Sequence, residues 1–313
     1  MKSMNKIYKW AIVPLFAGVF LSSCDFLQEN PDSVYTDKNY YVDTKTLKAG
    51  VVGVYSKIIN LYVINTDTPI FLTMLGTDEL CYRTANTNVR SAVDRYTYTS
   101  SEFWARYYYV IGQANVILDA APKITDITEK DRNQCMGEVR FLRAWSYFQL
   151  VQMFGDLPLI VNKTVEFDYT VPRSPLADVY KQIIEDLEFA SADGVLPTEI
   201  SDGHANHWAA KTLLAKVYLT MASAKKAAKV EGYARIAESS EDLYGKAYRL
   251  LGEIIDNSGR DLLPEYEDVF KIENKNTNKE SIWEIQFSAT EPYGTQWSKE
   301  MGLANAGYSQ TAG

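Results

Sequence analysis

The sequence has very few of the residues and motifs that catalytic and metal sites need. His204 and His207 are its two histidines; they could begin a zinc site, but no cysteine or acidic pattern nearby completes one. No GxSxG, phosphate-binding loop or HExxH motif occurs, and paired carboxylates such as Asp78-Glu79 are too common to indicate glycosidase chemistry. The sequence therefore predicts a protein that is not an enzyme and holds no metal or cofactor. It places both histidines in the turn before a helix.

Cysteine is also scarce, at three residues, and the chain lacks long blocks of like charge. Cys81 and Cys135 could form a disulfide in an oxidising compartment, but one pair in 313 residues is no framework, and the sequence leaves this pairing open. The formal net charge is −8, and removal of residues 1–23, which hold three lysines and no acidic residue, would make it −11. An acidic, evenly charged surface argues against a nucleic acid as partner.

Long apolar runs are absent apart from one at the N-terminus, where three lysines precede residues 11–21. This run is about half of the ~20 residues that a membrane-spanning helix needs, so it indicates the apolar core of a signal peptide. It leads into Leu21-Ser22-Ser23-Cys24, which resembles the lipobox of bacterial lipoproteins. That resemblance implies removal of residues 1–23, lipidation of Cys24 and a tether over residues 24–43. The alternative is an ordinary signal peptide that happens to be cleaved near a cysteine.

The rest of the chain is predicted to be mainly α-helical. Apolar residues at spacings of three and four predict an amphipathic helix over residues 44–61. Caps and helix breakers predict further helices over residues 100–120, 129–153, 174–192, 206–228 and 241–257. Residues 281–287 (SIWEIQF) are predicted to form a strand, because they are rich in β-branched and aromatic side chains. Paired helices of similar length suggest stacked helical hairpins.

Residues 136–154 differ from the other helical segments, because their apolar side chains wrap around the whole helix axis. Such a helix is central and buried. Glu138, Arg140 and Arg143 therefore need partners, since an unpaired buried charge is very costly. Arg143 and Tyr147 are four residues apart and can touch. The cluster is either a binding site or a paired polar network in the helical core; we favour the network, and we do not expect Glu138 to reach a substrate.

Several motifs then occur in the order found in one known family. Residues 138–148 (EVRFLRAWSYF) and 154–159 (FGDLPL) resemble the hallmark of SusD-like (RagB/SusD) outer-membrane lipoproteins, and other matches spread the resemblance over nearly all of residues 24–290. The resemblance implies tetratricopeptide-like helix pairs, a SusD-like α–α superhelix, that support a loop-rich region with few short strands. This domain would occupy residues 44–313. Family members are usually much longer, so we interpret the sequence as incomplete at its C-terminus.

The resemblance also implies a function, which is non-catalytic glycan capture at the surface of a Gram-negative cell. The lipid on Cys24 would anchor the protein to the outer membrane, over a SusC-like TonB-dependent transporter that receives the oligosaccharide. Two alternatives remain open. The protein could serve the uptake of another nutrient, such as peptides, or its helical repeats could be a scaffold that only holds partners.

Ligand-binding residues are expected in two polar loops that carry aromatic rings, because binding residues concentrate in loops. One loop covers residues 65–99 and the other residues 291–297. Sugars stack their C–H faces on such rings and pair their hydroxyls with polar groups. The alternative is that these rings pack on the scaffold. The candidates are Asp78, Tyr82, Arg83, Tyr96, Tyr293 and Trp297.

Overall fold

The computed structural model describes residues 40–62, 101–163, 170–199, 203–271, 274 and 278–287. The chain divides into two compact units, Met1–Tyr40 and Tyr41–Gly313. Tyr40 is the one described residue of the first unit, so the description below concerns the second unit. The predicted signal peptide and Cys24 lie outside the described residues.

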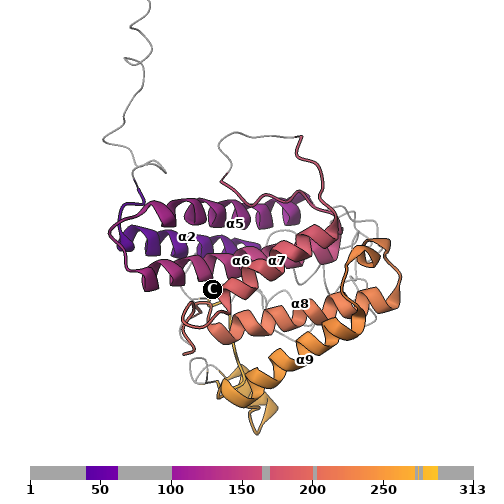
Figure 1. The fold of residues 1–313 in the computed structure, drawn as a ribbon. Coiled ribbons are helices and arrows are strands. Elements are labelled where there is room, and N and C mark those ends of the chain that lie inside the picture. Colours follow the sequence, from indigo (N-terminus) through magenta and orange to yellow (C-terminus); the bar gives the residue numbers. More distant parts are fainter. Residues whose placement is uncertain are drawn as a thin grey trace, which may run out of the picture. The chain divides into compact units, whose positions relative to one another are not determined.

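Helices make up most of the described part of the second unit, and the predicted mainly α-helical fold is confirmed (Figure 1). Each predicted helix agrees with an observed α-helix to within two residues at both ends. The described α-helices are α2 (Thr44–Tyr62), α5 (Ser101–Ala120), α6 (Glu129–Phe154), α7 (Leu176–Ala190), α8 (His207–Ala227) and α9 (Ser240–Asn257). Short 3-10 helices also occur, namely η1 (Ala121–Lys123), η2 (Glu231–Arg235) and η3 (Tyr266–Phe270).

The helices pack mainly against their neighbours in the chain. Helix α2 contacts α5, α5 contacts α6, α6 contacts α7, and α8 contacts α9, while α7 also packs on α8. Figure 1 shows α2, α5 and α6 side by side, and α8 with α9 as a pair. The apolar stripe predicted on α2 faces this core, since Leu47, Val51, Val54, Ile58 and Leu61 are all buried. Burying each such side chain contributes roughly 1.5–3 kcal/mol, which selects the face that α2 turns inward.

Helix α6 is the central helix, because it contacts α2, α5, α7 and α8. Its buried residues surround the axis, as the apolar pattern predicts. The helix begins where the side chain of Thr128 accepts a hydrogen bond from the amide of Asp131 (3.0 Å). It ends at Gly155, whose φ of +69° lies in the region that favours glycine. Local sequence thus determines both ends of the helix that carries the polar cluster.

The predicted strand over residues 281–287 is wrong, because these described residues form no β-ladder. Their side chains favour extended backbone, but a strand also needs a neighbouring strand to pair with. Within the described ranges, the β-bridges outside named strands are isolated, joining Asp43 to Asp126 and Leu157 to Ser174. Residues 281–287 are held by side-chain contacts instead.

None of the described helices is both long enough and apolar enough to cross a membrane. Cys135 on α6 is a free, buried thiol, so the disulfide with Cys81 that the sequence left open is not formed in this structure. Cys81 itself lies outside the described residues. Burial, together with the nearby Glu138, raises the pKa of the Cys135 thiol to about 11, which keeps it protonated at neutral pH.

Candidate functional site

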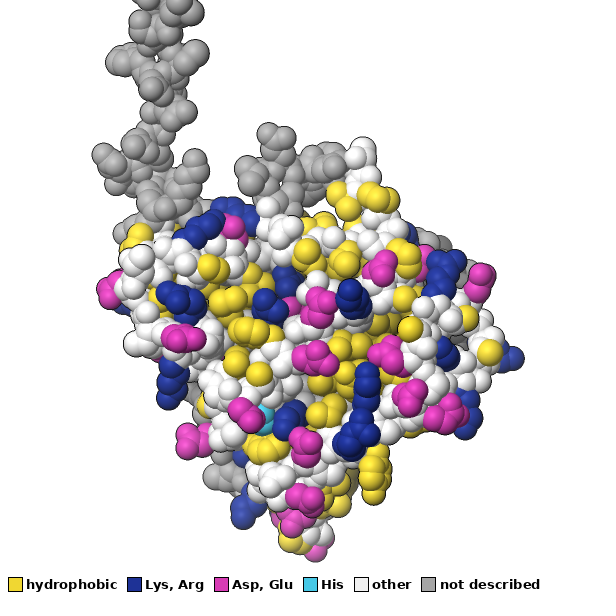
Figure 2. Space-filling model, in the orientation of Figure 1, with side chains coloured by type: hydrophobic (Ala, Val, Ile, Leu, Met, Phe, Trp, Pro, Cys, Tyr) yellow, Lys and Arg dark blue, Asp and Glu magenta, His cyan; other side chains and the backbone are white. Residues whose placement is uncertain are grey.

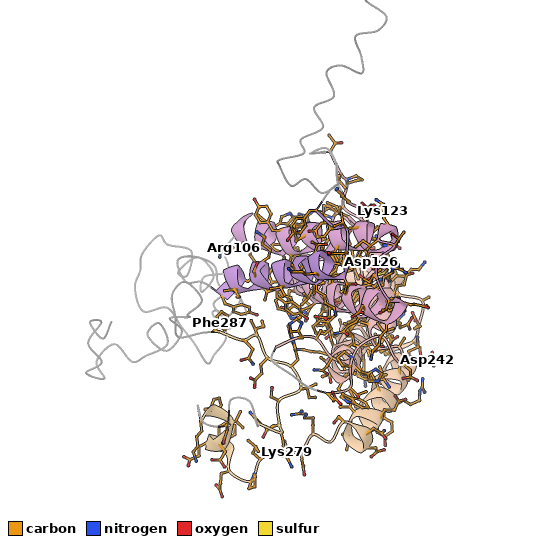
Figure 3. The ribbon with its side chains drawn as sticks, turned by 90° about the vertical axis from the view of Figure 1, so that its left-hand side faces the viewer. Arg106, Lys123, Asp126, Asp242, Lys279 and Phe287 are labelled. Carbon is orange, nitrogen blue, oxygen red and sulfur yellow. The ribbon has the colours of Figure 1, made fainter. Side chains whose placement is uncertain are left out.

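The last described residues before the two loops predicted to bind ligand contact each other. Tyr62 ends α2 and is the last described residue before the first loop, and its ring meets the ring of Phe287 edge to face at 6.0 Å. Phe287 is the last described residue before the second loop. Figure 3 labels Phe287 on the same side of the helices as Arg106, near the start of α5, whereas Lys123 and Asp126 lie on the other side. The last described residues before the two loops, Tyr62 and Phe287, therefore lie together at the end of α2.

The candidate ligand residues themselves lie outside the described part of the chain. These residues are Asp78, Tyr82, Arg83, Tyr96, Tyr293 and Trp297. Their role stays a prediction. The described residues show instead two polar networks centred on α6, one around Arg143 and one around Glu138.

The first network surrounds Arg143, which is 4% exposed. Its Nε and Nη2 atoms donate to the two carboxylate oxygens of Asp186 on α7, both at 2.7 Å, and Nη1 donates to Asn115 Oδ1 on α5 at 2.6 Å. Arg140 approaches the same carboxylate at 3.5 Å and lies over the ring of Phe189. Burial raises the pKa of Asp186, and the contact with Arg143 opposes that rise. The network thus joins three helices through one compensated buried charge.

This network also holds the segment that follows α6. The Tyr147 hydroxyl donates to the carbonyl of Ile160 (3.0 Å) and accepts from its amide (2.8 Å). Arg143 donates to the carbonyl of Val161, and Asn115 to that of Ile160. Arg143 and Tyr147, expected to touch, thus bind adjacent residues of one segment. Backbone N–H and C=O groups that are removed from water need hydrogen-bond partners, and here side chains make the hydrogen bonds that a neighbouring β-strand would otherwise make.

The second network surrounds Glu138, which is 4% exposed. Its Oε2 atom accepts from the hydroxyl of Tyr55 on α2 (3.0 Å) and lies 2.6 Å from Nδ1 of His204. The same hydroxyl accepts from the amide of Ala205 (2.7 Å), and the rings of Tyr55 and His204 meet edge to face at 5.0 Å. The carboxylate therefore ties the turn before α8 to both α2 and α6.

Residues 281–287 pack on this turn and on α6. The indole nitrogen of Trp283 donates to the carbonyl of Gly203 (2.9 Å), and its ring meets that of Phe141 on α6 edge to face at 4.9 Å. Asn206, which caps α8 through Oδ1, donates from Nδ2 to the carbonyl of Ile282 (2.9 Å). A side chain at Gly203 would place its Cβ 2.6 Å from Cγ of Gln286. The close approach therefore needs glycine.

A pocket of about 110 Å³ lies between α2, this turn and residues 281–287. It is lined by Val52, Tyr55, Ile58, Ile59, Gly203, His204, Trp283, Ile285 and Gln286. The lining is mainly aliphatic and aromatic, with the imidazole of His204 and the amide of Gln286 as polar groups. The volume suits a few water molecules or a small chemical group better than a whole sugar ring.

His204 lies in the turn before α8, where the sequence places it, whereas His207 is the first residue of α8 itself. His204 pairs with Glu138, whereas His207 is buried, and burial lowers its pKa. Among the described residues, no three His, Cys, Asp or Glu side chains are grouped to hold a metal ion. The sequence did not predict that Glu138 pairs with Tyr55 and His204. It indicated only that a buried carboxylate at position 138 needs hydrogen-bond donors.

Acidic and basic side chains are interspersed over the face shown in Figure 2. Exposed ion pairs such as Lys211–Glu253 (2.7 Å) join helices α8 and α9. That face has no large region of one charge, unlike the basic footprint expected of a nucleic-acid-binding surface.

The described part of the chain is thus a set of packed helices whose polar side chains hold the irregular segments at residues 158–162 and 203–206. A family model described as "Starch-binding associating with outer membrane" matches residues 25–219, and the chain belongs to this SusD-like family. A SusD-like protein of Bacteroides ovatus is 28% identical over 288 residues, which cover 89% of this chain and 50% of that protein. The chain therefore spans about half the length of this relative.

Solved structures give the same result for the fold. A structure titled "Laminarin binding SusD-like protein" matches with a TM-score of 0.63 and 25% identity, over 75% of this chain and 50% of that one. A structure whose title names a xylogluco-oligosaccharide matches with a TM-score of 0.64 and 26% identity, over 79% of this chain and 47% of that one. Both similarities support the helical SusD-like architecture.

Proposed function

We propose that this chain belongs to a non-catalytic cell-surface lipoprotein that binds oligosaccharides and passes them to a SusC-like TonB-dependent transporter. Family membership and the glycans named for two similar structures support the glycan as ligand. The observation that carries the proposal is the contact of Tyr62 with Phe287, because these are the last described residues before the two loops that the sequence separately selects.

In this proposal, the two loops form one glycan site. The rings of Tyr82, Tyr96, Tyr293 and Trp297 stack on sugar faces, and Asp78 and Arg83 pair with hydroxyls. Glu138, Arg140, Arg143 and Tyr147 have a structural role, because the described structure turns them toward protein groups. Lipid on Cys24 holds the protein at the outer membrane.

Isothermal titration of the purified chain against laminarin, xyloglucan and starch oligosaccharides tests the ligand. We expect one of these classes to bind, and Trp297→Ala to weaken that binding about tenfold or more, which corresponds to about 1.4 kcal/mol. Tyr248→Ala is the matched control, since Tyr248 is an aromatic residue that is 81% exposed on α9. Absence of binding to every glycan would refute the proposal, and binding of peptides instead would identify a different nutrient. Release of reducing sugar by the pure protein would show an enzyme.

Two further experiments test the anchor and the partner. Cys24→Ala is expected to abolish incorporation of a labelled fatty acid and to release the protein from outer-membrane fractions. Affinity purification from membranes is expected to recover a TonB-dependent transporter with the wild-type protein. A protein that purifies alone under mild detergent would count against the transporter complex.

A further inference from the structure

The four most exposed large apolar side chains of the described residues come from one short stretch of the chain. Tyr248 and Ile255, on α9, are 81% and 75% exposed, and Leu262 and Tyr266, which follow α9, are 78% and 79% exposed. Single exposed apolar residues are common on protein surfaces, but several that lie together mark a surface that packs on another structure. The two on α9 show most clearly how such a surface is built.

One face of α9 combines these two side chains with two glycines. Gly245, Tyr248, Gly252 and Ile255 follow one another at spacings of three and four residues, so they lie along one side of the helix. Among the described residues, a Cβ added at Gly252 meets no atom within 4 Å, and one added at Gly245 meets only the tip of Arg249, at 3.8 Å. Each glycine destabilises α9 by roughly 1 kcal/mol relative to alanine. On an open face they have no local use, but they let a second helix approach closely.

Another side of α9 already has its partner. Leu243, Ala247 and Ile254 are buried, and α8 is the described helix that α9 mainly contacts. Successive residues of an α-helix are about 100° apart, so this buried side is distinct from the face that carries Tyr248. Figure 1 shows α9 at the edge of the group of helices, beside α8. A helix that ends a stack of helical repeats normally has a polar outer face. The outer face of α9 is instead typical of a helix inside such a stack.

The length of the relatives indicates what covers this face. This chain spans about half of the SusD-like protein of Bacteroides ovatus, and the described helices pack mainly on their neighbours in the chain. A further helix would therefore extend the stack at α9. A second copy of the chain fits less well, because α9 has 18 residues and presents a strip of about 27 by 10 Å. Two such strips bury less than the roughly 800 Å² per partner of a stable dimer.

We infer that the face of α9 formed by Gly245, Tyr248, Gly252 and Ile255 is an internal interface of the complete protein, covered by a helix from the polypeptide beyond residue 313. The two glycines set a close distance between the helices, and the two large side chains pack against the added helix. The inference does not depend on the ligand, so failure of the chain to bind glycans leaves it intact.

Thiol labelling of the complete gene product tests this interface. Tyr248→Cys places a thiol on the face, and Glu253→Cys is the matched control, since Glu253 lies on the charged flank of α9 with its side chain 52% exposed. Both variants carry Cys81→Ser and lack residues 1–24, and peptide masses report each position separately. In the complete protein, position 248 should react about tenfold or more slowly than position 253, because it reacts only when the interface opens. In residues 25–313 alone, the two positions should react at similar rates.

A second measurement uses the opposite signs expected for Gly252→Ala. In residues 25–313 the alanine should raise the melting temperature, because it favours the helix and meets open space. In the complete protein it should lower the melting temperature, because the added methyl group would meet the covering helix.

Equal labelling of positions 248 and 253 in the complete protein would overturn the inference, and so would a rise in melting temperature for Gly252→Ala in that protein. Protection of position 248 in residues 25–313 that increases with protein concentration would identify a second copy as the occupant and would also overturn it. A gene product without residues beyond 313 would have the same consequence. If residues 25–313 do not fold alone, the two measurements on the complete protein decide the matter.

Discussion

Replacement of Arg143 by methionine should strongly destabilise the helical unit. Methionine matches the length of the arginine stem but removes the guanidinium, which leaves Asp186 fully buried without its main partner. The amide of Asn115 and the carbonyl of Val161 each lose a hydrogen bond as well. Arg140 is too far from the carboxylate, at 3.5 Å, to replace a two-point contact.

The size of the effect follows from the buried charge rather than from a count of hydrogen bonds. Breaking a buried ion pair by removing one partner costs about 3–5 kcal/mol. For a unit of about 150–250 ordered residues, 1 kcal/mol moves the melting temperature by roughly 2–4 °C. Arg143→Met should therefore lower the melting temperature by about 6–20 °C.

Thermal unfolding followed by far-ultraviolet circular dichroism measures this effect. Arg249→Met is the control, since Arg249 is exposed on α9 and its replacement should change stability by less than about 0.5 kcal/mol. The double variant Arg143→Met with Asp186→Leu should be less destabilised than the sum of the two single variants, because it leaves no lone charge. Additive losses, or a melting temperature for Arg143→Met close to that of the control, would refute this account of the network.

Three other measurements check local features. Gly203→Ala should lower the melting temperature, because φ is +82° and the new Cβ would lie 2.6 Å from Gln286. Gly252→Ala is the control, because Gly252 lies in α9 and no atom lies within 4 Å of the added Cβ; this variant should raise stability by roughly 0.5–1 kcal/mol. Equal changes in stability for Gly203→Ala and Gly252→Ala would contradict this expectation. A Cys81→Ser variant that lacks residues 1–24 keeps Cys135 as its one thiol. Because Cys135 is buried and its pKa is raised to about 11, this thiol should react with a thiol reagent only when the protein unfolds. Rapid labelling of the native protein would contradict this expectation. Asp43 accepts hydrogen bonds from Thr46, and these lower the pKa of its carboxyl below the ordinary value of 3.8. The ionised carboxylate therefore contributes to folding stability above pH 3.8, and this contribution is lost as the pH falls through the lowered pKa. The melting temperature should therefore decline less steeply on acidification in Asp43→Asn, and equal slopes would argue against the Asp43 cap.

The helices were predictable because their signals are local. The apolar stripe of α2, the Thr128 cap of α6 and the Asn206 cap of α8 each lie within a few residues of the feature they determine. The strand over residues 281–287 was mispredicted because pairing depends on a partner elsewhere in the chain. Isoleucine, tryptophan and phenylalanine favour extended backbone, but in this structure Trp283 packs on α6 instead.

For the candidate site too, the local features could be predicted from the sequence, whereas the contacts between distant parts of the chain could not. Burial of α6 could be read from its sequence, and so could the need of Glu138 and Arg143 for partners. The partners themselves could not, because Asp186 and His204 come from other elements and nothing local identifies them. The ligand residues proposed from the loops lie outside the described part of the chain, so they stay predictions.

The way α5 and α6 hold the segment after Gly155 has a consequence for sequence variation. Tyr108, Asn115, Arg143 and Tyr147 reach main-chain atoms of residues 158–162 and not their side chains. Hydrogen bonds to main-chain atoms do not depend on side-chain identity, so they hold the path of residues 160–162 whatever side chains these positions carry. The exception is position 160, whose amide donates to Tyr147 and where proline would be excluded. Leu159, in contrast, packs against the hydrophobic core.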